Sequence, residues 1–308
     1  MSRRGPDGSL QDDTLHEPEF DPPFEVVEPA ALTCPLVFSS PHSGSVYPRR
    51  FLEVSRLDAN ALRRSEDAFV DELFAGVTTL GAPLLRARFP RAYLDLNREA
   101  YELDPRMFEG RLPAFANTRS VRVAGGLGTI ARVVGESQEI YASRLSVTEA
   151  LTRIERLYKP YHARLSQLME RAQARFGVAI LVDCHSMPSM PSGALGADKR
   201  VLTDFVVGDR YGTSAAVQLV EVLERAMRER GFVVQRNKPY AGGYITEHYG
   251  TPAAGYHAIQ IEVNRAIYMD ESKLERAPRF PQMAADITAI IGDLAAFTAG
   301  YGLKAAAE

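Results

Sequence analysis

The hydrophobic pattern of the chain alternates between short apolar runs and longer amphipathic segments. Apolar runs that end in turn-forming residues predict strands at 35–40, 82–89, 92–97, 177–185, 231–237 and 257–265. Apolar positions at helical spacing predict helices from about residue 65 to 80, over 145–176 with a kink near Pro160, over 213–230 and over 281–300. Because strands alternate with helices, we expect an α/β protein with a mixed, mostly parallel central sheet flanked by helices.

Two segments stand outside this alternation. The first 24 residues are polar and rich in Pro, Gly and Asp, which predicts a loose leader followed by a single domain over 25–308. The stretch 101–135 is irregular and contains "GGLGT", so it forms either a lid or a small insertion.

Composition narrows the class of protein. The chain has 308 residues, 45% of them hydrophobic and 24% charged, with a net charge of −3, which gives no reason to expect nucleic acid or a membrane surface as partner. No apolar run approaches the roughly 20 residues needed to span a bilayer. Cys34 and Cys184 lie beside apolar runs and form no disulfide framework, so we expect reduced thiols in a cytoplasmic protein.

Polar residues gather where the predicted strands end, which is where open α/β sheets bind ligands. His42 follows the strand at 35–40, Asn97 and Arg98 follow the run "AYLDL", and His185 ends the run "GVAILVDC". Glu262 lies inside an apolar strand, where a buried carboxylate needs a partner cation or a chemical role.

Zinc prefers imidazole nitrogen and carboxylate oxygen, and a catalytic zinc site keeps three protein ligands and one open position. His42 and His185 offer two ligands, and "SED" at 65–67 offers Glu66 or Asp67 as the third. Each feature also has an ordinary explanation: a hydrogen-bonded histidine, an N-cap with acids in the first helical turn, and an internal pair between Asp95 and Arg98.

The order of several motifs decides between these explanations. Together they resemble the N-formylglutamate amidohydrolase family over about residues 35 to 275, and more distantly the zinc carboxypeptidases and zinc amidases, which implies a zinc exopeptidase-like fold. The motifs are "SSPHSG", "SEDAFVDELF", "FPRAYLDLNRE", "VDCHSMPS", "PYAGGY" and "IQIEVNRAIYMDE". The resemblance implies hydrolysis of the formyl amide of N-formyl-L-glutamate to formate and L-glutamate, as part of histidine degradation.

The resemblance also implies roles for individual residues. It implies one zinc ion per chain on His42 and His185, with metal-activated water and Glu262 as the general base. The carboxypeptidases place their acidic ligand three residues after the first histidine, where this chain has Ser45. The acid must therefore come from "SED": the wider family favours Asp67, and the amidases favour Glu66.

Substrate recognition is the last implied feature. Asn97 and Arg98 would hold one carboxylate of an acidic N-acyl amino acid. Candidates for the second carboxylate are Arg91, Arg132 and Arg265, because a planar guanidinium suits bidentate carboxylate binding. The Gly-containing segment 237–250 adds Tyr240 and His248, each either a substrate contact or a packing residue.

Two alternatives remain from the sequence. A zinc amidohydrolase acting on another N-acyl amino acid, or on a γ-glutamyl or peptidoglycan-like amide, would share these residues. A non-catalytic, metal-stabilised binding domain would require a closed site with four ligands. A thiol enzyme is disfavoured, because Cys184 and His185 are neighbours on a strand and point to opposite faces.

Overall fold

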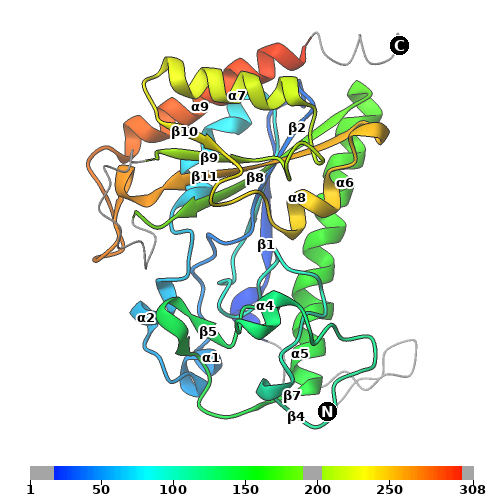
Figure 1. The fold of residues 1–308 in the computed structure, drawn as a ribbon, viewed down its shortest axis with the longest axis vertical. Coiled ribbons are helices and arrows are strands. Elements are labelled where there is room, and N and C mark those ends of the chain that lie inside the picture. Colours follow the sequence, from blue (N-terminus) through cyan, green and yellow to red (C-terminus); the bar gives the residue numbers. More distant parts are fainter. Residues whose placement is uncertain (1–16, 190–202, 300–308) are drawn as a thin grey trace.

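The protein folds around one central sheet with helices on both faces, as seen in a computed structural model that describes residues 17–189 and 203–299 (Figure 1). The sheet has seven strands in the order β1-β3-β2-β8-β11-β9-β10. Their bounds are β1 Phe24–Val27, β2 Leu36–Ser40, β3 Leu84–Ala87, β8 Ala179–Met187, β9 Phe205–Gly208, β10 Val234–Arg236 and β11 Tyr256–Asn264. Strands β3, β2, β8 and β11 are parallel, while β1 runs antiparallel to β3 and β9 antiparallel to β11. The predicted fold class is therefore confirmed.

The helices are unequal in length, and short ones dominate the segments that connect the strands. Their bounds are α1 Arg49–Val54, α2 Ala59–Arg63, α3 Val70–Leu73, α4 Val121–Ala124, α5 Val147–Arg153, α6 Lys159–Phe176, α7 Val217–Glu229, α8 Tyr244–Tyr249 and α9 Phe280–Thr298. Short 3-10 helices lie at Pro18–Phe20, Ala75–Leu80, Pro105–Met107, Gly135–Ser137, Pro252–Ala254 and Arg265–Ile267. Short strand pairs join β4 Phe108–Glu109 to β7 Leu145–Ser146, β5 Val133–Val134 to β6 Gln138–Glu139, and β12 Met269–Asp270 to β13 Glu275–Arg276.

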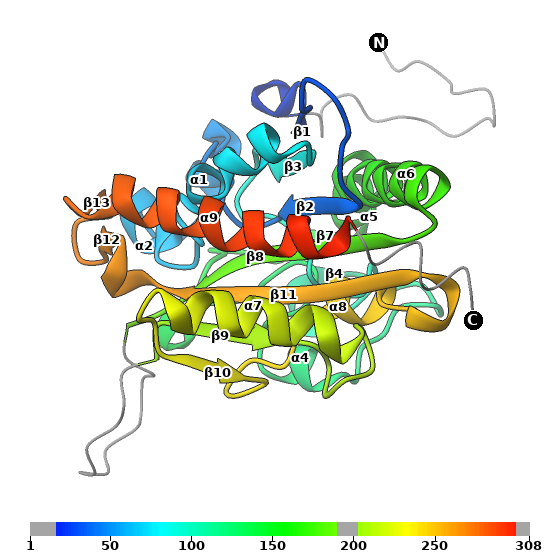
Figure 2. The same ribbon diagram turned by 90° about the horizontal axis from the view of Figure 1, so that it is seen from above.

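Two apolar cores lie on opposite faces of the sheet, because successive side chains of a strand point to opposite faces. Phe38 of β2 and Val182 of β8 pack with α7 and α9, whereas Val37 and Leu181, their neighbours in sequence, pack with α6. Helices α7 and α9 lie above the sheet in Figure 1 and together in front of it in Figure 2, and α8 lies below the sheet in Figure 1. A sheet buried on both faces leaves its carboxyl edge as the place for polar chemistry.

The predicted helix over 145–176 is present, but its hydrogen-bond pattern changes at the predicted kink. A π-helical segment at Ile154–Tyr158 joins α5 to α6 just before Pro160, and the N–H of Lys159 donates to the carbonyl of Ile154. Proline lacks an N–H and its ring crowds the preceding turn, so a wider turn accommodates it.

Two other predictions about local structure are wrong. The helix expected from residue 65 to 80 starts only at Val70, because Phe69 has a left-handed φ of 65°, and it is divided at Phe74 into α3 and a 3-10 helix. The strand expected at 92–97 is a series of turns, because the N–H groups of Tyr93 and Leu94 both donate to the carbonyl of Pro90. A ladder strand could not make these local bonds.

The last residues of the predicted leader, 17–24, belong to the folded part of the structure. Residues 1–16 lie outside the described residues. Phe20 is only 3% exposed, and its ring packs edge-on against Phe89 and Tyr93. Residues 17–24, which the sequence assigned to the leader, therefore pack against the domain. Both cysteines are buried and free. In the two described ranges no helix is long and apolar enough to cross a membrane.

Candidate metal centre

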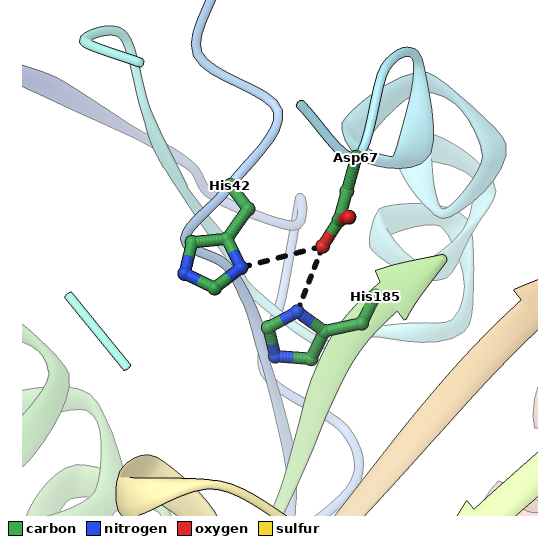
Figure 3. Close-up of side chains that lie close together, drawn as sticks. All are labelled: His42, Asp67 and His185. Carbon is green, nitrogen blue, oxygen red and sulfur yellow. Dashed lines mark hydrogen bonds and ion pairs between the residues drawn. The ribbon is translucent and has the colours of Figure 1, made fainter. Parts of the chain in front are cut away.

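Three buried side chains converge at the carboxyl edge of the sheet (Figure 3). His42 lies two residues after β2, His185 lies two residues before the end of β8, and Asp67 lies three residues before α3. Oδ2 of Asp67 is 3.3 Å from Nδ1 of His42 and 2.9 Å from Nδ1 of His185. Both imidazole Nδ1 atoms therefore face one carboxylate oxygen.

Local backbone contacts hold the His42 loop in place. The N–H of Asp67 donates to the carbonyl of His42 at 3.0 Å, which ties the two candidate ligands together. Gly44 approaches the neighbouring chain so closely that a Cβ there would lie 2.1 Å from the carbonyl oxygen of Phe89. The "PHSG" turn thus requires glycine at its last position, because only glycine permits this approach.

The opposite nitrogen of each imidazole is held by a second carboxylate. Nε2 of His42 donates to Asp95 at 2.7 Å, and Nε2 of His185 donates to Asp183 at 2.8 Å. A metal-ligating histidine almost always donates its other ring N–H in this way, which orients the ring and leaves the facing nitrogen for the metal. His42 Nδ1 is buried and has no hydrogen-bond partner in the described part of the chain.

These donors fit a zinc ion. Ligands bound to tetrahedral zinc at about 2.0–2.2 Å lie roughly 3.4 Å apart, close to the separations found here. Burial opposes ionisation of Asp67, yet the neighbouring imidazoles of His185 and His42 hold its pKa well below the usual range. Burial lowers the pKa of His185, but Asp183 and Asp67 outweigh that effect and raise it.

Glu66 points into a different cluster from Asp67. Its carboxylate accepts hydrogen bonds from the hydroxyl of Tyr47 at 2.6 Å and from Nε of Arg63 at 3.2 Å. Burial raises the pKa of Glu66, although both partners lower it. Of the two acids that the sequence offered, the structure brings only Asp67 to the histidines.

Glu262 lies beside the cluster on β11, in register with His185 on β8. Its Oε1 accepts a hydrogen bond from Nε2 of Gln260 at 2.8 Å. Burial raises the pKa of Glu262 to about 7, although His185, Arg91 and Arg265 lower it. A carboxylate with a pKa near the working pH can accept and return a proton efficiently.

A cavity of about 740 Å³ opens over these groups. Six further residues of the predicted site line it together with His42, Asp67 and His185: Arg91, Asn97, Arg98, Tyr240, Glu262 and Arg265. The irregular stretch 101–135 supplies one wall, through residues such as Arg122 and Leu127. That stretch therefore builds the binding cavity.

Two predicted substrate contacts lie elsewhere. Arg132 pairs with Asp104 at 3.0 Å and with Glu139 at 3.2 Å, and it lines a separate cavity. His248 stacks on the ring of Tyr244, with the ring centroids 5.0 Å apart, outside the lining of the main cavity. Ion pairs explain the position of Arg132, and ring stacking explains that of His248.

Asn97 and Arg98 line the cavity but are already bound within the protein. Nη1 and Nε of Arg98 donate to the carbonyls of Asn97 and Leu127, and Nη2 lies 3.4 Å from Asp95. Asn97 Nδ2 donates to Asp183 at 3.3 Å, while its Oδ1 accepts the N–H of Ile245 at 2.7 Å. The internal Asp95–Arg98 pair, the ordinary explanation of this motif, is present.

Sequence reasoning missed the two outer carboxylates and three cavity arginines. Asp95 and Asp183 each interrupt an apolar run, and that burial was the available signal. Arg64, Arg122 and Arg210 come from segments without regular periodicity, so no pattern identified them.

Buried imidazole and carboxylate donors at the carboxyl edge of a mostly parallel sheet, beneath a cationic cavity, define an α/β protein of the hydrolase type with a candidate metal centre. The family model for N-formylglutamate amidohydrolase matches residues 34–269. The chain belongs to this family, which confirms the resemblance of its motifs.

Individual relatives agree with the family match. An N-formylglutamate deformylase of Pseudomonas putida is 28% identical over 242 residues, covering 78% of this chain and 83% of the relative. The crystal structure of an N-formylglutamate amidohydrolase from Ralstonia eutropha JMP134 has 38% identity and a TM-score of 0.84, covering 90% of this chain and 98% of that one. A gene product of Agrobacterium tumefaciens shares the fold at 17% identity, with a TM-score of 0.63 over 92% and 96% of the two chains.

Proposed function

We propose that this chain hydrolyses the formyl amide of N-formyl-L-glutamate to formate and L-glutamate, using one zinc ion held by His42, Asp67 and His185. The observation that carries this proposal is the pair of imidazoles whose Nδ1 atoms face Asp67 while Asp95 and Asp183 hold their Nε2 atoms. Support for the substrate comes from relatives named N-formylglutamate deformylase.

When bound, zinc would polarise the formyl carbonyl and make water a stronger nucleophile near neutral pH. The protein's part is to present its three donors in a fixed arrangement. Asp95 and Asp183 keep both rings oriented, and Arg265 Nη2 donates to the second oxygen of Asp67 at 3.1 Å. With three donors in the described part of the chain, one position is left for substrate or water.

Glu262 is the proposed general base. Its carboxylate takes a proton from the attacking water and then gives it to the amine nitrogen that leaves as the amide breaks. Its pKa of about 7, raised by burial, suits both steps. Gln260 holds one carboxylate oxygen at 2.8 Å, so the other oxygen remains for the proton.

A zinc amidohydrolase acting on another N-acyl amino acid would use the same residues. We also infer, from the resemblance, a place in cytoplasmic histidine degradation, which a deletion strain grown on histidine as sole nitrogen source tests.

A formate-release assay on N-formyl, N-acetyl and γ-glutamyl substrates, with and without a chelator, separates these functions. We expect rapid release from N-formyl-L-glutamate that stops with chelator and returns with zinc. Preference for another acyl group would assign the alternative activity, and zinc binding without turnover of any substrate would indicate a binding domain.

A further inference from the structure

The cavity above the candidate metal centre is strongly cationic. Its lining contains six arginines but only three carboxyl groups, those of Asp67, Asp95 and Glu262. Four of the arginines are already paired with acids: Arg91 with Asp95 at 2.8 Å, Arg98 with Asp95 at 3.4 Å, Arg265 with Asp67 at 3.1 Å, and Arg210 with Glu247 at 2.7 Å. Their charges mainly balance the protein's own carboxylates, so they are poor candidates for the principal substrate anchors.

Arg64 and Arg122 differ from the other four. Both are exposed, and in the described ranges neither guanidinium makes a hydrogen bond or ion pair with another residue. Arg122 also acts on its surroundings: burial lowers the pKa of Arg98, and the charges of Arg91 and Arg122 lower it further. Unbalanced positive charge therefore remains in the cavity, and a bound anion would stabilise it.

The two arginines come from different parts of the cavity wall. Arg64 is the C-cap residue of α2, and its carbonyl accepts a hydrogen bond at 3.4 Å from Arg265, which also donates to Asp67. Arg122 lies on α4, near Arg98 and thus on the side of Asp95, which holds the outer nitrogen of His42. Helices α2 and α4 lie apart in both Figure 1 and Figure 2.

We propose that Arg64 and Arg122 bind the two carboxylates of the substrate, Arg64 the α-carboxylate and Arg122 the side-chain carboxylate. The assignment follows from distance along the substrate. The α-carboxylate is closer to the scissile amide than the side-chain carboxylate is, and Arg64 belongs to the loop that carries Asp67. Arg122 comes from α4, a segment that carries none of the three candidate ligands. The site would thereby select N-acyl amino acids with two carboxylates, a claim that rests on the proposed function.

Substrate pairs that differ by one charge test this proposal. We would measure kcat/KM for N-formyl-L-glutamate, N-formyl-L-glutamine and the α-amide of N-formyl-L-glutamate with the wild type, Arg64→Gln and Arg122→Gln. A hydrogen bond to a charged group contributes a net free energy that corresponds to about 10–100-fold in affinity. In the wild type we expect kcat/KM to be higher for N-formyl-L-glutamate than for either amide. Arg122→Gln should reduce the preference over N-formyl-L-glutamine by about 10–100-fold, and Arg64→Gln should reduce the preference over the α-amide by about the same factor. Both losses should come mainly from a higher KM for N-formyl-L-glutamate.

Arg119→Gln is the matched control. Arg119 is an exposed arginine three positions before Arg122, and it does not line the cavity. Its replacement should leave all three kcat/KM values within about 2-fold of the wild type, and zinc content and melting temperature should be unchanged in all three variants. If both Arg64→Gln and Arg122→Gln keep the wild-type preference for N-formyl-L-glutamate over the two amides, the proposal is overturned. If Arg64→Gln affects the preference over N-formyl-L-glutamine and Arg122→Gln the preference over the α-amide, the assignment of the two carboxylates is overturned.

Calorimetric titration with L-glutamate separates this proposal from the proposed function, because it needs no turnover. We expect L-glutamate to bind the zinc-loaded wild type, and Arg122→Gln to bind it about 10–100-fold more weakly. Absent formate release together with this loss of binding would refute the function and leave the two anchors standing. Equal L-glutamate affinity in the wild type and both variants would refute the anchors whatever the activity.

Discussion

The clearest test of the outer carboxylates compares Asp95→Asn with Asp183→Asn, because the two acids hold the two histidines alike but differ in their other partners. Asp95 also pairs with Arg91 and Arg98 and accepts the N–H of Asn97, whereas Asp183 has one oxygen without a partner in the described part of the chain. Either substitution weakens the hold on one imidazole. Only Asp95→Asn also leaves two guanidiniums without their carboxylate.

The magnitudes follow from these contacts. Loss of an outer carboxylate costs about 10–100-fold in metal affinity, and we expect that loss from both variants. Removing one partner of a fully buried ion pair destabilises a protein by about 3–5 kcal/mol. Since the Arg91 side chain is 24% exposed, solvent screens part of its attraction to Asp95. We therefore expect Asp95→Asn to lower the free energy of unfolding by about 3 kcal/mol. Asp183→Asn should cost less than Asp95→Asn, because it weakens the contact with His185 but leaves no guanidinium without its carboxylate.

Zinc affinity is measured by competition with a chromophoric chelator, and stability by urea unfolding of the metal-free proteins, so that metal binding does not contribute to the unfolding free energy. Wild-type zinc affinity in both variants would refute the role of the outer carboxylates. Equal loss of stability in both would refute the role given to the arginine pairs of Asp95.

Three further predictions concern single residues. His185→Ala should lose both zinc and activity, and stoichiometric zinc in a His42→Ala, His185→Ala double variant, measured by atomic absorption, would exclude the site. Glu66→Gln should keep zinc and lose stability, because only its bonds to Tyr47 and Arg63 change; a variant without zinc would contradict this. Burial lowers the pKa of His257 to about 4, below its unfolded value of about 6.5. The neutral ring therefore contributes up to about 3 kcal/mol to the free energy of unfolding above pH 6.5, and this contribution is lost as the pH falls to 4. In urea unfolding at a series of pH values, His257→Asn should remove that part of the pH dependence, and an unchanged profile would contradict this.

The sequence predicted the parts of the site that depend on local pattern. Apolar runs revealed β2, β8 and β11, and their ends carry His42, His185 and Glu262. The carboxyl ends of parallel strands meet at one edge of the sheet, so the proximity of these residues could be predicted from the sequence. Their convergence with Asp67 is observed, while their roles with zinc remain predictions.

The features that sequence reasoning missed depend on contacts between distant segments. Asp67, and not Glu66, faces the histidines, and its N–H donates to the carbonyl of His42, a contact between two segments that leaves no trace in the periodicity. Whether an arginine is free or paired also depends on distant partners: Arg265 reaches Asp67 across 198 positions, and Arg98 reaches the carbonyl of Leu127 across 29. No local motif encodes those pairings.

The most direct test of the whole account is formate release by Glu262→Gln together with its zinc content. Glutamine keeps the shape of the side chain and its contact with Gln260, but it cannot accept a proton. We predict a folded protein with one zinc per chain, whose kcat for N-formyl-L-glutamate falls by about 10²–10⁴-fold. Near-normal turnover by the zinc-loaded variant would contradict the account, because the proton would then be taken by another group.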